Sequence, residues 1–488
     1  MHEDPLYLEP RLERPLAALL GERAFLHTLV GALGSPLAVL IPGQLGENVG
    51  RFRAVYGRHR LTGRVLLAHK ANGAHCLVRH LAATDAALDA ASLRELQHAL
   101  GSGFAPDRLL CTGPKDPEFL WLAARTGTTV HLDSRGELEQ LTALVREYGL
   151  PRVPVLLRLS GFESPGVRVR SRPSRFGTYP KELDALLDSL ERHRDTVEPI
   201  GTAYHLDTTS LDEKAVALEG CLLALDALRQ RGFQPRAVDI GGGFGVNYLA
   251  HGAQWERYTS ALAEAVLGRG QPLTRGGHGY GLRTENGVLR GTLGLYPCHR
   301  PVAGPAYLDE LLARPAPLLG RPLGTLLLDS LCELWTEPGR ALLDQCGLTL
   351  ARVLDVRTPD TGPPLVRLAA KASDIGLEEH GVLMDPVLVP QGDGPAAGAP
   401  AGVHLVGSLC LESDLITRRT VFLPRLPRPG DLLAFANTAG YCMDFHATRA
   451  QGQPPARKVA VRRSGAGGWS WCLDEKYWPV TRPEVQRT

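Results

Sequence analysis

The sequence lacks the marks of a membrane or secreted protein. No stretch approaches the run of about 18 apolar residues that a membrane-spanning helix requires. Residues 1–14 are charged and do not show the basic-then-apolar order of a secretion signal. We therefore expect a cytoplasmic protein with no membrane partner, and we find no internal repeat.

The sequence also lacks an excess of charge of one sign and a paired cysteine motif. The 54 basic and 52 acidic residues leave a net charge of +2 without a basic run, which argues against a nucleic-acid partner and favours small molecules. The nine cysteines include no CxxC pair, which argues against a disulfide framework and a structural zinc site. We expect no metal and mostly reduced, buried thiols.

The chain has 488 residues, enough for a large core and two domains. Short apolar strands alternate with segments of helical period, such as 183–192 and 215–231, which is typical of a parallel sheet wound by crossover helices. Eight predicted strands suggest an α/β fold of the (β/α)₈ TIM barrel type over 45–345. These strands are 64–70, 87–90, 108–112, 128–132, 154–159, 201–206, 236–240 and 333–337.

The flanking segments read as strands without intervening helices. We expect residues 1–44 and 346–488 to combine into a second, all-β domain. A long glycine-containing connection at 246–332 interrupts the barrel, and such excursions are more often functional or mobile than structural. The predicted strands of the second domain are 36–41, 348–357, 365–369, 402–406, 431–435 and 458–461.

Lys70 is the first candidate for chemistry. It ends an apolar run where a buried strand stops, and α/β barrels place their active sites at the carboxyl ends of such strands. An amine in that position can form a Schiff base. The alternative is a lysine that merely extends into solvent, so the hypothesis depends on the neighbouring strand ends.

Two glycine-bearing turns follow the seventh and eighth predicted strands. The first, at 239–245, would let backbone N–H groups approach a phosphate, although glycines also serve simply to turn a chain off a strand. The second, at 337–340, adds a guanidinium suited to phosphate. Together they predict a phosphate site made by Gly241, Gly242, Gly243, Gly339 and Arg340.

His205 and Thr208 follow the sixth predicted strand. A histidine there is often only a core or surface residue. In this setting its ring could instead stack on a flat cofactor, with the Thr208 hydroxyl reaching a phosphate oxygen.

The order and spacing of these segments resemble the fold-type III pyridoxal-phosphate decarboxylases, which include diaminopimelate and ornithine decarboxylases. The resemblance covers nearly the whole chain. It implies an alanine racemase-like barrel that holds pyridoxal phosphate, a β domain, and a head-to-tail homodimer with active sites at the subunit interface. The matched segments are 69–72, 89–95, 112–115, 174–177, 205–208, 239–245, 337–340 and 410–414.

The resemblance also implies roles at matched positions. Lys70 would hold pyridoxal phosphate covalently, His205 would stack on its ring, and Glu337 would pair with the pyridine nitrogen. An acid there keeps that nitrogen protonated and able to accept electrons, which favours decarboxylation, whereas racemases of this barrel use an arginine. The remaining cofactor-binding residues would be Asp89, Thr208, Gly241, Gly242, Gly243, Gly339, Arg340 and Tyr441.

Three residues of the second domain complete the expected site. Cys410 would reach into the partner subunit's site and return a proton to the product, although a cysteine is more often a small buried residue. Asp414 and Tyr441 would contact the substrate, and Tyr441 could alternatively belong to the core. Lys70, His205 and Cys410 would therefore be the catalytic residues.

Departures from the family pattern bear on the substrate. Leu411 follows the cysteine where diaminopimelate decarboxylases have an acid that binds the distal amine, so diaminopimelate is a doubtful substrate. The 246–332 insertion resembles the branch that decarboxylates citrate-linked diamino acids in siderophore assembly. Its arginines could meet extra substrate carboxylates or could be solvated surface charges. They are Arg275, Arg283, Arg290 and Arg300.

Our hypothesis is a pyridoxal-phosphate-dependent decarboxylase that removes the α-carboxylate of an amino acid or amino-acid conjugate. Siderophore or other secondary-metabolite biosynthesis is its candidate pathway. Two alternatives remain open: an amino-acid racemase or epimerase on the same barrel, and a catalytically silent decarboxylase-like protein with a regulatory binding role.

Overall fold

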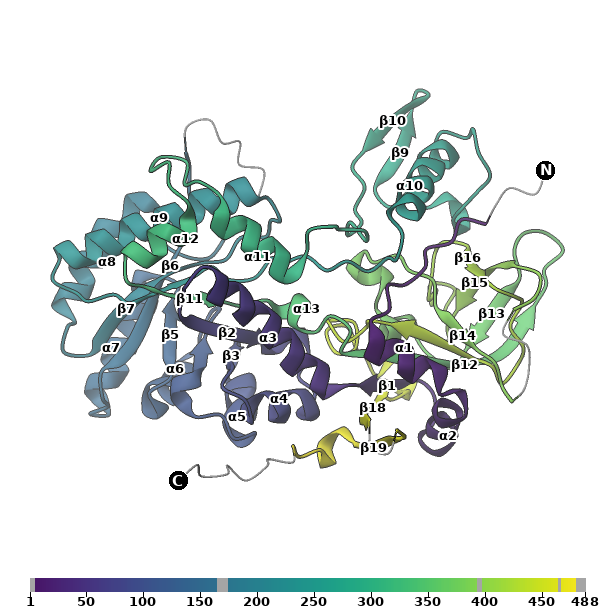
Figure 1. The fold of residues 1–488 in the computed structure, drawn as a ribbon, viewed down its shortest axis with the longest axis horizontal. Coiled ribbons are helices and arrows are strands. Elements are labelled where there is room, and N and C mark those ends of the chain that lie inside the picture. The colour runs from purple at the N-terminus through teal and green to yellow at the C-terminus, as the bar shows by residue number, and fades with distance from the viewer. Residues whose placement is uncertain (1–4, 165–173, 393–396, 464–466, 480–488) are drawn as a thin grey trace. The chain divides into compact units, whose positions relative to one another are not determined.

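The computed structural model describes residues 5–164, 174–392, 397–463 and 467–479. The chain divides into two compact units, shown in Figure 1. The sheet unit comprises Met1–Gln44, Val246–Pro301 and Leu343–Tyr477, and the barrel unit comprises Leu45–Gly245, Val302–Leu342 and Trp478–Thr488.

The barrel unit contains a closed barrel of parallel strands in the order β11-β2-β3-β4-β5-β6-β7-β8. The ring closes where β11 pairs with both β8 and β2. All eight predicted strands are confirmed, and with them the barrel. Their bounds are β2 (Gly63–Ala68), β3 (Ala87–Ala90), β4 (Leu109–Cys111), β5 (Thr129–Leu132), β6 (Val153–Leu159), β7 (Val197–Tyr204), β8 (Ala237–Asp239) and β11 (Glu333–Thr336).

Buried side chains from these strands form one hydrophobic cluster. A barrel of eight strands is just wide enough for such side chains to fill it, so its centre is a packed core and its active site lies at one end. The cluster comprises Leu66, Ala87, Leu110, Leu156, Ile200, Ala203, Ala237 and Trp335.

Helices follow the strands along the chain and start at defined caps. Ser92, Asp116, Ser134 and Ser210 each accept a backbone N–H from the first turn of their helix, which satisfies a donor that has no helical partner. The helical segments predicted at 183–192 and 215–231 correspond to α8 and α9. The bounds are α3 (Pro42–Arg58), α4 (His75–Ala82), α5 (Leu93–Gly101), α6 (Pro117–Thr126), α7 (Arg135–Glu147), α8 (Leu183–Arg192), α9 (Leu211–Gln230), α11 (Gly304–Ala313), α12 (Leu323–Asp329) and α13 (Gly339–Leu342).

The sheet unit is built around a nine-stranded sheet with the order β16-β15-β13-β12-β1-β18-β19, while β17 pairs with β12 and β14. β1 lies antiparallel to β12 and parallel to β18, so the N-terminal and C-terminal segments share one sheet. The bounds are β1 (Leu37–Leu40), β12 (Gly347–Arg357), β13 (Leu365–Leu368), β14 (Val387–Val389), β15 (Ala401–Val406), β16 (Val421–Leu423), β17 (Leu432–Ala436), β18 (Arg457–Arg463) and β19 (Trp469–Leu473).

This second unit is mostly sheet rather than all-β. It also contains α1 (Arg14–Gly21), α2 (Arg23–Leu33), α10 (Gly252–Val266) and α14 (Ala372–Ile375). The apolar residues of α1 and α2 are buried at the helical period, which the strand-oriented reading of these segments did not detect.

The long connection after β8 is divided between the two units, whereas we had expected all of 246–332 to be an insertion in the barrel. Its first part belongs to the sheet unit because its backbone bonds to that unit: Arg11 N–H donates to Tyr248 O, and Arg275 N–H donates to Arg418 O, each over 2.7 Å. This part carries the hairpin of β9 (Leu282–Glu285) and β10 (Val288–Gly291), and the second part supplies α11 and α12 of the barrel unit.

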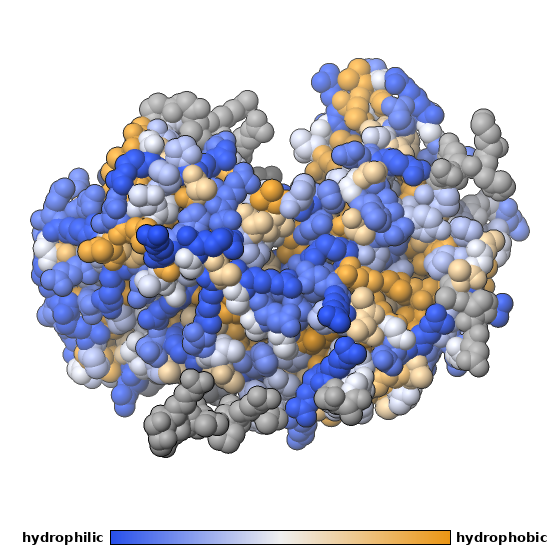
Figure 2. Space-filling view, viewed as in Figure 1, coloured by the Kyte–Doolittle hydropathy of each residue, from blue (hydrophilic) through white to orange (hydrophobic). Residues whose placement is uncertain are grey.

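The surface visible in Figure 2 is mostly hydrophilic, with apolar residues in scattered patches, as is usual when the main core is enclosed. Among the described helices, none alone is long and apolar enough to cross a membrane. α1 and α2 pass that test only as a pair, across a bend of 76°.

Candidate active site

A cavity of about 450 Å³ lies at the carboxyl ends of the barrel strands. Lys70, His205 and Glu337, which were predicted from three separate strand ends, all line it. His131 and Arg158, from β5 and β6, line it too. The fold thus collects a lysine, a carboxylate and two imidazoles into one pocket.

Lys70 lies half-buried in a single 3-10 turn, η1 (His69–Ala71), directly after β2. The last four residues of β2 are buried, which fixes where the turn begins. On the neighbouring strand, Asp89 is buried at 1 % exposure and accepts a hydrogen bond of 2.5 Å from Thr112 Oγ1. Burial, together with the charge of Glu337, raises the pKa of Asp89 to about 6, and the positive charge of Lys70 opposes this rise.

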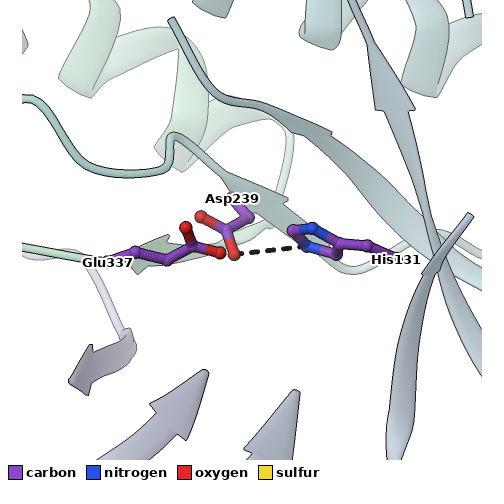
Figure 3. A group of neighbouring side chains, drawn as sticks. All are labelled: His131, Asp239 and Glu337. Atoms are coloured by element: carbon purple, nitrogen blue, oxygen red, sulfur yellow. Dashed lines mark ion pairs between the residues drawn. The ribbon is translucent and has the colours of Figure 1, made fainter. Parts of the chain in front are cut away.

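Glu337 faces Asp239 and His131 at the end of β11, as Figure 3 shows. His131 Nε2 lies 3.4 Å from Asp239 Oδ2, and both side chains are buried. Burial lowers the pKa of His131 to about 4 and raises the pKa of Asp239 to about 7. The imidazole of His131 is therefore neutral at pH 7. The carboxyl groups of Asp239 and Glu337 lie together here, and their position favours a positively charged ligand.

One oxygen of Glu337, Oε1, is buried and accepts no N–H or hydroxyl hydrogen bond from the described residues, while the Glu337 side chain contacts the carboxyl group of Asp239. A buried acceptor left unpaired is costly, so this atom marks a place where a ligand donor fits. The other oxygen, Oε2, lies 3.3 Å from His205 Nδ1. One possible metal-ligand atom from each of His131, Asp239 and Glu337 lies within 4.8 Å of the other two, close enough to hold a metal ion. The sequence had indicated no metal.

The glycine turn after β8 is packed so closely that side chains would not fit. A Cβ on Gly241 would lie 2.6 Å from Tyr204 O, and one on Gly242 would lie 3.0 Å from Glu337 O. Gly241 also has a positive φ of 61°, which favours glycine. Asp239 Oδ1 accepts the Gly241 N–H over 2.8 Å, so the carboxylate at the strand end holds the turn in place.

This turn presents free donors. The N–H groups of Gly243 and Phe244 have no acceptor among the described residues. The adjoining turn is bonded to it, because Glu337 N–H donates to Gly241 O over 2.9 Å. Arg340 on α13 and Thr208 after β7 are both half-buried, and Thr208 Oγ1 accepts the Ser210 N–H over 3.1 Å. Free N–H groups and glycine-only backbone fit a bound phosphate.

Cys410, Asp414 and Tyr441 belong to the sheet unit. Cys410 is exposed, in contrast to the usual burial of a thiol. Asp414 is buried, and its two carboxylate oxygens accept the N–H groups of Ala372 and Leu409, each over 2.8 Å. Its bonding indicates a residue that holds the turn carrying Cys410, and its contact with substrate stays a prediction. Tyr441 is half-buried at a positive φ of 70°.

The sequence reading did not select several residues of this site. His131 and Arg158 lie on predicted strands and line the cavity. The alternation of side chains along a strand was the signal that could have predicted that they face it. Asp239 lies in the recognised glycine segment but was not assigned a role. Phe176 lines the cavity and carries the Arg158 guanidinium 4.7 Å from its ring centre.

Comparison with known proteins agrees with this geometry. Residues 43–287 match the pyridoxal-binding domain of the pyridoxal-dependent decarboxylases. The chain is 30 % identical over 437 residues to an uncharacterized protein, y4yA, of Sinorhizobium fredii, covering 88 % of each chain. It is 30 % identical over 439 residues to a diaminopimelate decarboxylase of Pseudomonas aeruginosa, covering 87 % of each. A solved diaminopimelate decarboxylase of Helicobacter pylori, complexed with L-lysine, shares the fold with a TM-score of 0.65 at 17 % identity, covering 92 % of this chain and 95 % of that one.

The chain belongs to the pyridoxal-dependent decarboxylase family. It is accordingly a pyridoxal-phosphate-dependent amino-acid decarboxylase of the group that includes the diaminopimelate, ornithine and arginine enzymes. The site fits this cofactor on its own evidence, since the buried Glu337 carboxylate, the lysine and the glycine turn supply the three contacts that the cofactor needs.

Proposed function

We propose that this decarboxylase removes the α-carboxylate of an amino-acid conjugate whose distal end carries a further carboxylate, and that it works as a homodimer with shared active sites. The observation that supports the reaction centre is that Lys70 and Glu337 line one cavity. A racemase on the same barrel is less favoured because the residue after β11 is a carboxylate rather than a guanidinium.

In this proposal Lys70 holds the cofactor aldehyde covalently, and the half-buried turn η1 directs its amine into the cavity. When bound, pyridoxal phosphate supplies a protonated ring that accepts the electron pair released as CO₂ leaves. Glu337 Oε1, which is buried and has no N–H donor among the described residues, would accept the ring N–H and keep that proton in place. His205, the neighbour of Glu337, packs on the ring face.

The phosphate is held by backbone N–H groups of the glycine turn together with the Arg340 guanidinium. Thr208, Gly241, Gly242 and Gly339 complete the same cradle. Asp89 and Asp239 are buried acids behind the site; with its pKa raised to about 7, Asp239 is half protonated at neutral pH, whereas Asp89, with a pKa of about 6, is mostly ionised.

Cys410 would act in the partner subunit's site by returning a proton to the carbon that lost CO₂. Two features support this role: the thiol is exposed, and its turn is fixed by the bonds of Asp414. Gln451 Oε1 accepts the Cys410 N–H over 3.1 Å and adds a second anchor to the turn. Tyr441 would contact the phosphate or the substrate from the same unit.

The distal part of the substrate is suggested by the residues next to Cys410. Leu411, which replaces an acid in the family pattern, is exposed at 55 % and offers no partner for a distal amine. Arg275, from the excursion after β8, forms an ion pair of 3.7 Å with Glu412. A guanidinium beside this turn suits a substrate carboxylate. Citrate-linked diamino acids of carboxylate-siderophore assembly have this character.

The reaction is tested by CO₂ release from a panel of amino acids and citrate-linked diamino acids, with α-carbon configuration followed in parallel. Wild-type protein should release CO₂, and Lys70→Ala should lose both this activity and the covalent cofactor adduct trapped by borohydride. Lys181→Ala removes an exposed lysine of the same unit and should retain both. Undiminished CO₂ release by Lys70→Ala, or inversion of configuration without CO₂, would overturn the proposal.

The substrate class is tested through Arg275. Arg275→Ala should raise KM about 10-fold or more for a substrate with a distal carboxylate, the size of a lost charge-assisted contact, and should leave KM unchanged for a substrate without one. Arg283→Ala is the matched control, because Arg283 is exposed on the hairpin and already pairs with Glu285 over 2.6 Å. Equal effects of the two variants would contradict the assignment of a distal carboxylate.

A further inference from the structure

Lys214 is a fully buried lysine, with 0 % exposure, in the first turn of α9. No carboxylate of the described residues forms an ion pair with it. Burying an ammonium without a compensating partner is expensive. Packing alone does not explain why a lysine, rather than an apolar residue, is buried here.

The ammonium is held by the glycine turn. Lys214 Nζ donates a hydrogen bond to the carbonyl oxygen of Gly242. A Cβ on the next residue, Gly243, would lie 2.9 Å from Nζ, so the turn wraps around the ammonium at a distance that only glycine permits.

Aromatic faces surround the remaining side of the charge. Nζ lies 5.2 Å from the ring centre of Phe244, 5.9 Å from that of Tyr204 and 6.0 Å from that of Tyr307. Cation–π attraction offsets part of the cost of burial. Burial lowers the pKa of Lys214 to about 8, while Glu337 and Asp239 raise it, so most molecules carry the charge at pH 7.

The planarity of the peptide bond links this contact to the phosphate site. In a trans peptide the C=O of Gly242 and the N–H of Gly243 point in opposite directions. Because the carbonyl points to Lys214, the N–H points to the opposite side of the turn. That N–H has no acceptor among the described residues, and Gly243 is exposed.

We propose that Lys214 is a positioning residue of the phosphate site: from behind the turn it fixes the Gly242–Gly243 peptide so that the Gly243 N–H faces the cofactor phosphate. This inference rests on the proposed placement of the phosphate at the glycine turn. The ammonium adds positive potential to that of the N-terminus of α9, and both favour an anion on the far side of the turn.

The test compares binding of pyridoxal phosphate and of pyridoxal, which lacks the phosphate, to cofactor-free protein. Lys214→Met should weaken pyridoxal phosphate binding about 10- to 100-fold, the range of a charge-assisted hydrogen bond, and leave pyridoxal binding unchanged. Lys214→Gln, which keeps a donor without charge, should show a smaller loss and decides the matter if the Met variant does not fold. Inorganic phosphate should compete with pyridoxal phosphate less effectively in both variants.

Lys115→Gln is the matched control. Lys115 is the buried lysine that pairs with Glu137 over 2.7 Å, and its replacement should change binding of the two compounds in equal proportion. Equal losses in the Lys214 variants, or no loss, would overturn the inference. If wild-type protein itself bound both compounds equally, the phosphate site of the proposed function would fail instead.

Discussion

His205 and Glu337 approach each other at the ends of β7 and β11, with His205 Nδ1 3.3 Å from Glu337 Oε2. One carboxylate oxygen therefore touches the residue proposed to cover the ring face, while the other is buried and has no N–H donor among the described residues. The two oxygens of a single side chain thus have separate tasks. This division predicts what happens when only the charge of Glu337 is removed.

Glu337→Gln keeps the shape of the side chain but removes its charge, so a pyridine nitrogen beside it would lose its proton. We expect CO₂ release to fall about 100- to 1000-fold, the usual effect of deleting one preorganised electrostatic partner. Cofactor binding should persist, because Lys70 and the phosphate contacts are intact. Single-turnover CO₂ assays with the visible absorbance of the bound cofactor measure the two effects separately. Near-normal activity would show that Glu337 does not face the ring nitrogen.

The raised pKa of Asp239 predicts how the free energy of unfolding depends on pH. Its pKa is raised from 3.8 to about 7 by burial, so the folded state binds this proton more tightly than the unfolded state. The resulting stability is fully present below pH 3.8 and is lost as pH rises through about 7, by up to about 1.4 kcal/mol per pH unit. The melting temperature of cofactor-free protein should therefore fall over this range.

Asp239→Asn should flatten this pH dependence, because the amide cannot ionise but can still accept the Gly241 N–H. The change should amount to roughly 1–2 °C per kcal/mol for a chain of this length, measured by thermal unfolding of both proteins at matched pH values. Asp226→Asn, an exposed carboxylate on α9, should leave the slope as in wild type. Identical slopes for wild type and Asp239→Asn would show that Asp239 is ionised throughout.

The barrel strands could be predicted because each is a short apolar run that ends in a polar or glycine turn. The same criterion missed β14, β16 and β19. Two of these have three residues each, and so short a segment is hard to recognise outside the regular alternation of strands and helices that marks the barrel. The pairing of β1 with β12 and β18 joins residues far apart in sequence, so sequence reading anticipated a shared domain but not its register. The helices α1 and α2 were missed although Pro15 and Gly34 are usual start and stop signals, because neither helix has a side-chain N-cap.

The candidate site divides in the same way. Lys70, His205 and Glu337 follow strand ends, and parallel strands bring their carboxyl ends to one rim, so their meeting was predictable. Lys214 was not, because α9 is buried over much of its circumference and shows no distinct polar face from which a buried charge would stand out. His131 was missed because its position on a strand does not by itself show whether the side chain faces the active site or the surrounding helices.

Gly241→Ala tests the phosphate cradle through backbone geometry. At a φ of 61° an alanine costs about 1–2 kcal/mol, and here its Cβ would also lie 2.6 Å from Tyr204 O. We expect a larger loss of stability than this strain alone, and pyridoxal phosphate binding weakened at least about 10-fold, because a shift of the turn displaces the N–H donor of Gly243. Gly232→Ala is the control, because Gly232 has a φ of 75° but its nearest neighbour lies 3.7 Å away. Equal binding by both variants would contradict a phosphate at this turn.

Shared active sites predict recovery of activity between two inactive proteins. Cys410→Ala should lower CO₂ release about 100- to 10,000-fold, the contribution of a positioned proton donor, and Lys70→Ala should abolish it. In a mixed dimer, one site combines the native Lys70 of one chain with the native Cys410 of the other, while the second site lacks both residues. Coexpressed variants, isolated through two different affinity tags, should therefore regain a substantial part of wild-type activity per native site. If Lys70 and Cys410 acted within the same chain, no site of the mixed dimer would be complete, and the activity would stay at the level of the single variants.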